Sequence, residues 1–144
     1  AEACAQVSHN HPEGIKGAKA TAAAVFMANN RYSKTDIHHY IQNTFGYNLE
    51  RKLDTIRADY RFDVTCQGSV PEAIIAFLEA TDLEDAIRNA ISLGGDADTQ
   101  ACIAGGIAEA YFGPPDNDLT RQIKSRLPVK FIEVIDAFYT QFIN

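Results

Sequence analysis

The sequence has little or none of several residue types that mark particular protein classes. Tryptophan is absent, methionine occurs once, and the three cysteines, Cys4, Cys66 and Cys102, form no Cys-x-x-Cys pair. An odd, widely spaced set of cysteines argues against a disulfide framework or a thiolate zinc site, and it fits a reducing cytoplasm. No apolar run approaches the roughly 20 residues that a membrane-spanning helix needs, so we expect no membrane partner.

An excess of basic residues is also missing. Lysine and arginine number 13 against 19 acidic residues, for a formal net charge of -6. This balance argues against a nucleic-acid partner, which would favour a basic face. It still allows an anionic small-molecule substrate, because a bound metal ion can invert the local field. With 144 residues, 46% of them hydrophobic, the chain is long and apolar enough for one domain with a core.

Most of the chain has the pattern of α-helix, and no segment alternates as a strand does, so we predict an all-α fold. Proline, glycine and capping residues mark the helix ends, including capping boxes that we predict at Ser69 and at Thr81. The predicted helices cover residues 13–29, 33–45, 49–56, 69–79, 81–93, 99–111, 118–127 and 128–144. The opening residues, Ala1-Glu2-Ala3-Cys4, also read as helix and not as a signal peptide, which indicates that the chain begins within a domain.

The strongest chemical signal is Gly94-Gly95-Asp96-Ala97-Asp98-Thr99, between two predicted helices. A glycine turn allows the two carboxylates and the hydroxyl to converge, and such an all-oxygen set suits Mg²⁺ or Mn²⁺. The alternative is structural, with one aspartate as an N-cap and the other in the turn. The helix that follows is rich in alanine and glycine, which predicts close packing in the interior, where two unpaired carboxylates would be costly.

Two further segments carry candidate binding residues. His9 and His11, in Ser8-His9-Asn10-His11-Pro12-Glu13, could hydrogen bond a sugar or phosphate, whereas the structural alternative makes His11 a helix cap and His9 an exposed loop residue. In Cys66-Gln67-Gly68-Ser69 the cysteine is more simply buried than nucleophilic, since the sequence places no base beside it. Gly68 and Ser69 could instead offer backbone N–H groups to an anionic ligand.

Taken together, these segments resemble the C-terminal signature of the ADP-ribosylglycohydrolase family. The resemblance rests on Gly94-Gly95-Asp96-Ala97-Asp98-Thr99 with Tyr111-Phe112-Gly113, on Ser69-Val70-Pro71-Glu72-Ala73-Ile74, and on Ser8-His9-Asn10-His11-Pro12. It covers essentially the whole chain and is closest to the bacterial branch that includes the dinitrogenase reductase-activating glycohydrolase. It implies an all-α fold around two Mg²⁺ or Mn²⁺ ions and hydrolysis of the bond between ADP-ribose and a protein side chain, commonly arginine.

The resemblance also implies a role for particular residues. The metal ligands would be Asp96, Asp98 and Thr99, with Asp98 bridging the two ions, and the substrate-binding residues would be His9, Gly68 and Ser69.

The sequence departs from the family in one respect. The family's N-terminal half carries a Thr-Asp-Asp ligand motif, and this chain contains none. We therefore expect residues 1–144 to form a single domain equivalent to the C-terminal half, with an N-terminal half as a second polypeptide partner that holds the general base. On this hypothesis the chain alone is inactive and exposes a large apolar surface, and His9 lies near the Asp96–Asp98 cavity.

Two other functions remain open at this point. One is a catalytically inactive domain that holds ADP-ribose through His9 and the Gly68-Ser69 turn. The other is a purely structural helical domain in which Asp96 and Asp98 are caps.

Overall fold

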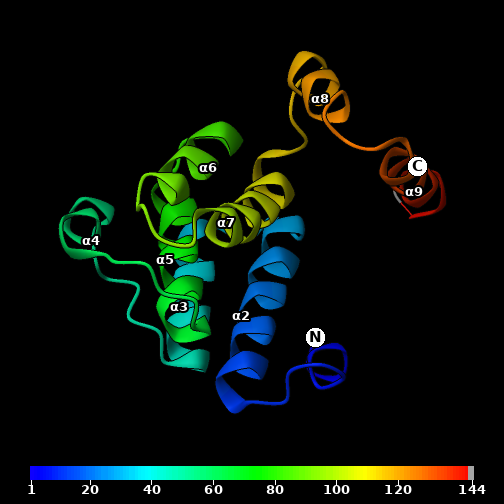
Figure 1. Cartoon of the computed structure of the whole chain (residues 1–144). Coiled ribbons are helices and arrows are strands. Elements are labelled where there is room, and N and C mark those ends of the chain that lie inside the picture. Colours follow the sequence, from blue (N-terminus) through cyan, green and yellow to red (C-terminus); the bar gives the residue numbers. More distant parts are fainter. Residues whose placement is uncertain (143–144) are drawn as a thin grey trace. The chain divides into compact units, whose positions relative to one another are not determined.

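The computed structural model describes residues 1–142 and is entirely helical over that range, which confirms the all-α prediction (Figure 1). Its helices are α1 (Glu2–Ala5), α2 (Pro12–Asn29), α3 (Lys34–Phe45), α4 (Leu53–Asp59), α5 (Cys66–Glu79), α6 (Leu83–Ile91), α7 (Ala97–Phe112), α8 (Asn117–Lys124) and α9 (Val129–Phe142). The chain divides into two compact units, Ala1–Pro114 and Pro115–Asn144. The expectation of one domain over the whole chain stays a prediction.

The ends of α2 and α3 lie where the sequence predicts them. Pro12 is the first residue of α2, and the His11 side chain caps this helix by accepting a hydrogen bond from the backbone N–H of Glu13. Ser33 and Asp36 form a complete capping box at the start of α3. Gly46 ends α3 with a φ of 69°, a left-handed conformation that glycine adopts without steric cost.

The predicted capping box at Ser69 is wrong. Helix α5 begins one turn earlier, at Cys66, and Thr65 is its N-cap, with a side chain that accepts a hydrogen bond from the Gly68 N–H. Ser69 is buried within the helix, and its hydroxyl donates to the backbone carbonyl of Asp63. Residues 57–68, which lie between two predicted helices, therefore contribute residues to both α4 and α5.

The starts of α4, α6 and α7 also differ from the prediction. The short helix expected over residues 49–56 is α4, which begins at Leu53 and reaches Asp59. Helix α6 has Asp82 as its N-cap, not Thr81, and the Asp82 carboxylate accepts from the Asp85 N–H. Helix α7 begins at Ala97, two residues before its predicted start, so Asp98 and Thr99 lie in its first turn.

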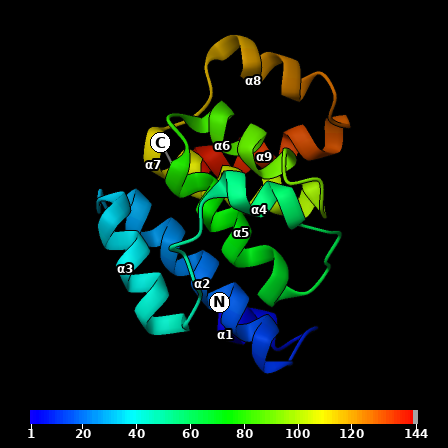
Figure 2. The same ribbon diagram turned by 90° about the vertical axis from the view of Figure 1, so that its left-hand side faces the viewer.

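Helices α5 and α7 form the centre of the first unit. Helix α7 packs against α2, α5 and α6, and α5 also contacts α2, α4 and α6, while α3 lies alongside α2 (Figure 2). The fully buried side chains of this core include Ile37, Ile41, Ile74, Ile75, Phe77 and Ile107. The close packing predicted for α7 holds on one face, where a β-carbon at Gly105 would lie 3.3 Å from the Ile87 side chain. The opposite face of α7 is exposed at Cys102 and Gly106.

The second unit contains α8 and α9. Neither helix has a buried residue, and Lys124 of α8 forms an ion pair of 2.7 Å with Asp136 of α9. The last helix was expected to run to residue 144, and its final two positions lie outside the described residues. Over the described part of the chain, no helix is long and apolar enough to cross a membrane.

Candidate functional site

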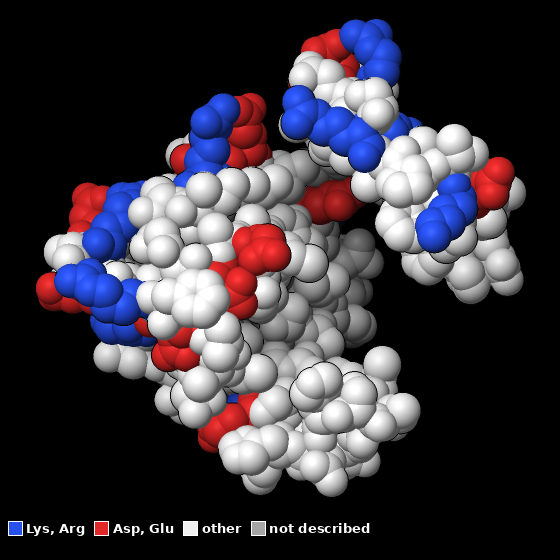
Figure 3. All heavy atoms as spheres, in the orientation of Figure 1, with Lys and Arg blue, Asp and Glu red and all other residues white. Residues whose placement is uncertain are grey.

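The acidic turn before α7 brings two carboxylates together. Asp96 occupies the N-cap position of α7, but its side chain makes no capping hydrogen bond. Side-chain hydrogen bonding with Asp96, and then bonding to the backbone N–H groups of Asp98 and Thr99, lowers the pKa of the Asp98 carboxyl below its usual value. Acidic side chains gather over α7 in the space-filling view (Figure 3). Asp96 and Asp98 thus lie within hydrogen-bonding reach of each other. Asp98 and Thr99 are exposed and Asp96 is half-buried, so the expected placement of both carboxylates in the interior is wrong.

The surroundings of this pair contain no compensating cation within the described residues. Neither Asp96 nor Asp98 takes part in a salt bridge to any lysine, arginine or histidine of residues 1–142. Two adjacent carboxylates with the Thr99 hydroxyl one residue on make an oxygen-only donor set, which fits Mg²⁺ or Mn²⁺. The same described residues hold no cluster of three or more histidine, cysteine or acidic side chains suited to a metal. The donor set therefore fits an ion but is short of a complete two-ion site.

A large groove lies in the same unit, beside α2. Its volume is about 830 Å³, and its walls come from the α1–α2 loop, α2, the start of α5 and one residue of α7. Lining residues are Ala5, His9, His11, Glu13, Gly14, Gly17, Ala18, Thr21, Ala22, Thr65, Cys66, Gln67, Val70 and Ile103. The walls are mainly apolar, and polar side chains stand at the ends near the loop and α5. Such a cavity has the size and composition of a small-molecule site.

The two histidines of the α1–α2 loop take different places. His9 lies at the groove with an exposed side chain, and its Nδ1 is 2.9 Å from the Ser8 hydroxyl. His11 also lines the groove, but its Nδ1 is used to cap α2. The structure therefore leaves the His9 ring available to a ligand and gives His11 the structural role that was its alternative.

Gly68 and Ser69 lie directly behind the groove wall. The backbone N–H groups of both residues donate to Thr65 inside the first turn of α5, so they do not offer free donors to an anion. The wall itself is formed by Thr65, Cys66 and Gln67. At Gly68 a β-carbon would meet the Asp63 carboxylate at 2.1 Å, so a larger residue there would displace the Asp63 side chain.

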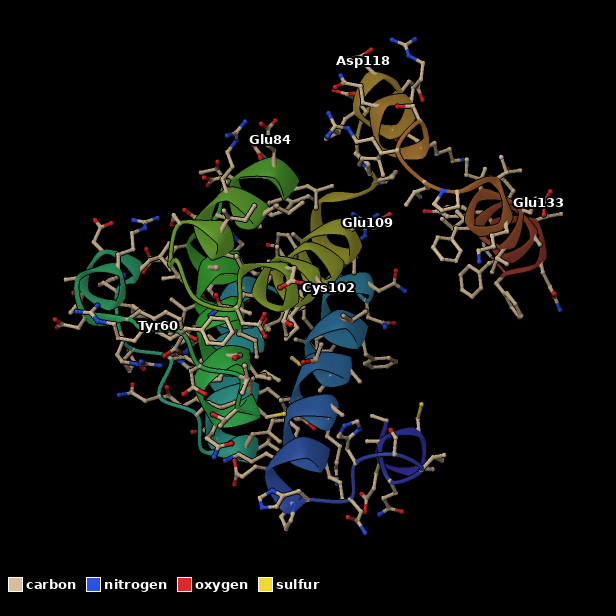
Figure 4. All side chains as sticks on the ribbon, in the orientation of Figure 1. Tyr60, Glu84, Cys102, Glu109, Asp118 and Glu133 are labelled. Carbon is tan, nitrogen blue, oxygen red and sulfur yellow. The ribbon has the colours of Figure 1, made fainter. Side chains whose placement is uncertain are left out.

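Tyr60 joins the acidic turn to the start of α5. Its hydroxyl donates to the Gly68 carbonyl at 2.8 Å and accepts from Gln100 Nε2 at 2.8 Å. Figure 4 shows Tyr60 on the stretch between α4 and α5. No sequence signal marks this residue, because its partners are 8 and 40 positions away.

Two large apolar side chains of the first unit are exposed outside the groove lining. Phe26, near the end of α2, is 64% exposed, and Val7, in the loop before α2, is 86% exposed.

A family model for ADP-ribosylglycohydrolase matches residues 1–138 of this sequence. No curated protein and no solved structure matches it. The match takes in the groove, the acidic turn and the helices between them, as well as most of the second unit. An all-helical chain whose sequence fits this family model almost from end to end is a member of the ADP-ribosylglycohydrolase family.

Proposed function

We propose that this chain contributes one half of a two-metal active site that hydrolyses the bond linking ADP-ribose to an arginine side chain. The family match supports the general activity, hydrolysis of a bond to ADP-ribose. The observation that carries the proposal is the close approach of Asp96 and Asp98, two carboxylates that form no salt bridge among the described residues.

In this proposal Asp96, Asp98 and Thr99 hold Mg²⁺ or Mn²⁺. The carboxylates bring negative charge to one point, and the Thr99 hydroxyl adds a neutral oxygen from the first turn of α7. When bound, the ions would orient the ribose hydroxyls and polarise the anomeric centre, as metal ions do in related hydrolyses. The ligand count supports a second contributor, because three side chains from one turn cannot supply near-octahedral coordination to two ions.

The groove is the proposed site for the remainder of ADP-ribose. His9 presents an exposed ring that can hydrogen bond a phosphate or sugar oxygen. Cys66 and Gln67, the first two residues of α5, line the groove, and their backbone N–H groups have no hydrogen-bond partner in residues 1–142. The N-terminal end of a helix attracts anions, so these two residues fit the diphosphate better than Gly68 and Ser69, whose role is to shape the wall.

The proposed partner is a polypeptide that carries the family's N-terminal metal motif and the general base. The exposed side chains of Phe26 and Val7 offer apolar contact area to such a partner. All three cysteines are free, which fits the proposed cytoplasmic location.

The test is release of ADP-ribose from ADP-ribosyl-arginine in the presence of Mg²⁺ or Mn²⁺. We expect little turnover by the chain alone and turnover when the N-terminal polypeptide is added. Asp98→Asn should abolish that turnover, whereas Asp118→Asn, an exposed carboxylate of α8, should leave it unchanged. Robust turnover by the isolated chain would overturn the two-part site. Binding of ADP-ribose with equal affinity with and without metal, and no turnover with the partner, would favour an inactive binding domain.

A further inference from the structure

We propose that Tyr60 is the positioning residue of the acidic turn, holding Asp96, Asp98 and Thr99 in place relative to the start of α5. This inference rests on the proposed function insofar as the turn is taken to bind a divalent cation. The geometry behind it is independent of the metal, because it concerns only contacts within the chain.

Tyr60 touches the chain on both sides of the candidate ligands. Gly95 directly precedes Asp96, and its backbone lies against the Tyr60 ring, where a β-carbon would be 2.3 Å from Cε1. Gln100 directly follows Thr99, and its Nε2 donates to the Tyr60 hydroxyl at 2.8 Å. A single aromatic side chain thus fixes the residue before and the residue after the segment Asp96–Thr99.

The hydrogen bond between Tyr60 and Gln100 matters for stability because the Gln100 side chain is fully buried. Its exposed fraction is 0%, and Tyr60 is its sole side-chain hydrogen-bond partner within residues 1–142. A buried amide that loses its partner costs more free energy than a surface hydrogen bond of the same length. The Tyr60–Gln100 bond therefore selects one arrangement of the first turn of α7.

The third contact connects this turn to α5. The Tyr60 hydroxyl donates to the Gly68 carbonyl, while the Ser69 hydroxyl next to it donates to the Asp63 carbonyl. Tyr60 also ends α4, where its backbone N–H bonds to Ile56, a residue of the core. The tyrosine is thereby anchored, and it sets the distance between the carboxylates and the α5 end of the groove.

The test uses the ¹⁵N-labelled full chain and compares Tyr60→Phe, which deletes only the hydroxyl, with Tyr32→Phe, which deletes an exposed one. Without metal, we expect Tyr60→Phe to shift the backbone amide signals of both Gly68–Ser69 and Gly95–Thr99. With Mn²⁺, we expect its affinity to fall about tenfold, the scale of residues that orient metal ligands. Gly95→Ala, which displaces the ring, should act in the same direction.

Ile41→Val, a core substitution in α3, distinguishes a positioning role of Tyr60 from a purely structural one. It is chosen because its loss of melting temperature should be comparable to that of Tyr60→Phe. If Tyr60 acts by positioning, Ile41→Val leaves Mn²⁺ affinity unchanged and Tyr60→Phe does not. The inference is overturned if Tyr60→Phe shifts the amide signals of Gly95–Thr99 no more than Tyr32→Phe does. It is also overturned if these signals shift while Tyr60→Phe keeps its Mn²⁺ affinity. Failure of the unmodified chain to bind Mn²⁺ would remove the proposed metal site, and the metal-free amide signals would then decide the role of Tyr60.

Discussion

At the scale of single residues, Tyr47 is unusual because its hydroxyl is buried without a hydrogen-bond partner among the described residues. The side chain is 5% exposed, and none of the described residues hydrogen bonds to its hydroxyl. Lys16 lies over the ring, 4.6 Å from its centre. Burial, with the negative charges of Glu13 and Cys66 nearby, raises the pKa of Tyr47 to about 12.

This raised pKa predicts a loss of stability in alkali. The folded pKa lies above the unfolded value of about 10, so the neutral tyrosine contributes stability below pH 10 that is lost as the pH rises towards 12. Tyr47→Phe should reduce this alkaline loss in the free energy of unfolding by roughly 1–2 kcal/mol. At pH 7 it should be neutral or stabilising by up to about 1 kcal/mol, because an unpaired buried hydroxyl is removed. Urea unfolding at pH 7 and pH 11 measures both effects, and equal pH slopes for the two proteins would contradict the prediction.

At the scale of elements, Lys34 stabilises the end of a helix to which it does not belong. Helix α5 has no basic residue in its last turn, and Lys34 Nζ, from the start of α3, donates to the carbonyls of Leu78 and Ala80. Partial burial lowers the pKa of Lys34, and the charge of Asp85 opposes this. The ammonium group also faces three aromatic rings, those of Phe77, Tyr111 and Phe112.

We predict that Lys34→Met lowers the free energy of unfolding by about 1–3 kcal/mol. The substitution keeps the apolar stem and removes the hydrogen bonds to the α5 carbonyls and the contacts with the rings. The matched control is Lys52→Met, since Lys52 is 79% exposed and lies 4.0 Å from Glu79. That change should cost less than about 0.5 kcal/mol. Equal effects of the two substitutions in urea unfolding would show that Lys34 has no capping role.

The pair of Arg51 and Glu72 holds α5 to the segment before α4. The Nη1 and Nη2 atoms of Arg51 donate hydrogen bonds to the Glu72 carboxylate, at 2.8 Å and 2.6 Å. The Glu72 side chain is 6% exposed. Removing one partner of such a pair leaves a charge buried and unpaired. The predicted capping role of Glu72 is thus replaced by an ion pair with a residue 21 positions earlier.

We predict that Arg51→Met lowers the free energy of unfolding by about 2–4 kcal/mol. The double variant with Glu72→Met should be more stable than Arg51→Met alone, because no buried charge is then left unpaired. Arg88→Met, which breaks an exposed pair with Glu84 in α6, is the control and should cost less than about 0.5 kcal/mol. With Glu72→Met alone, these variants complete a double-mutant cycle measured by chemical denaturation, and additive costs for the two members of the buried pair would refute the coupling.

At the scale of the whole molecule, the acidic turn predicts a response to divalent ions. A ligand that binds only the folded state raises stability by about 1.4 kcal/mol at ten times its dissociation constant. For a chain of this size that corresponds to about 3–5 °C in melting temperature. We expect Mn²⁺ to raise the melting temperature of the chain and of Asp118→Asn, and to leave that of Asp98→Asn unchanged. An equal rise in all three proteins would indicate nonspecific binding to the acidic surface.

What the sequence by itself determined is local. Pro12, the Ser33 and Asp36 box and Gly46 act on hydrogen bonds within a few residues, so the ends of α2 and α3 could be predicted from them. The acidic turn was also recognisable, because its two carboxylates and its glycines lie within six consecutive residues. Its assignment as a metal site came from the family resemblance and stays a proposal.

Only the tertiary structure decided how the other parts are used. Ser69 and Glu72 have the spacing of a capping box, but Asp63 accepts the serine hydroxyl and Arg51 takes the carboxylate, so α5 begins at Cys66. The groove and the contact of Tyr60 with Gln100 join residues 40 or more positions apart. Such contacts form because a buried polar group must find a hydrogen-bond partner, which can be distant in sequence. The local spacing of residues does not indicate which partner that is.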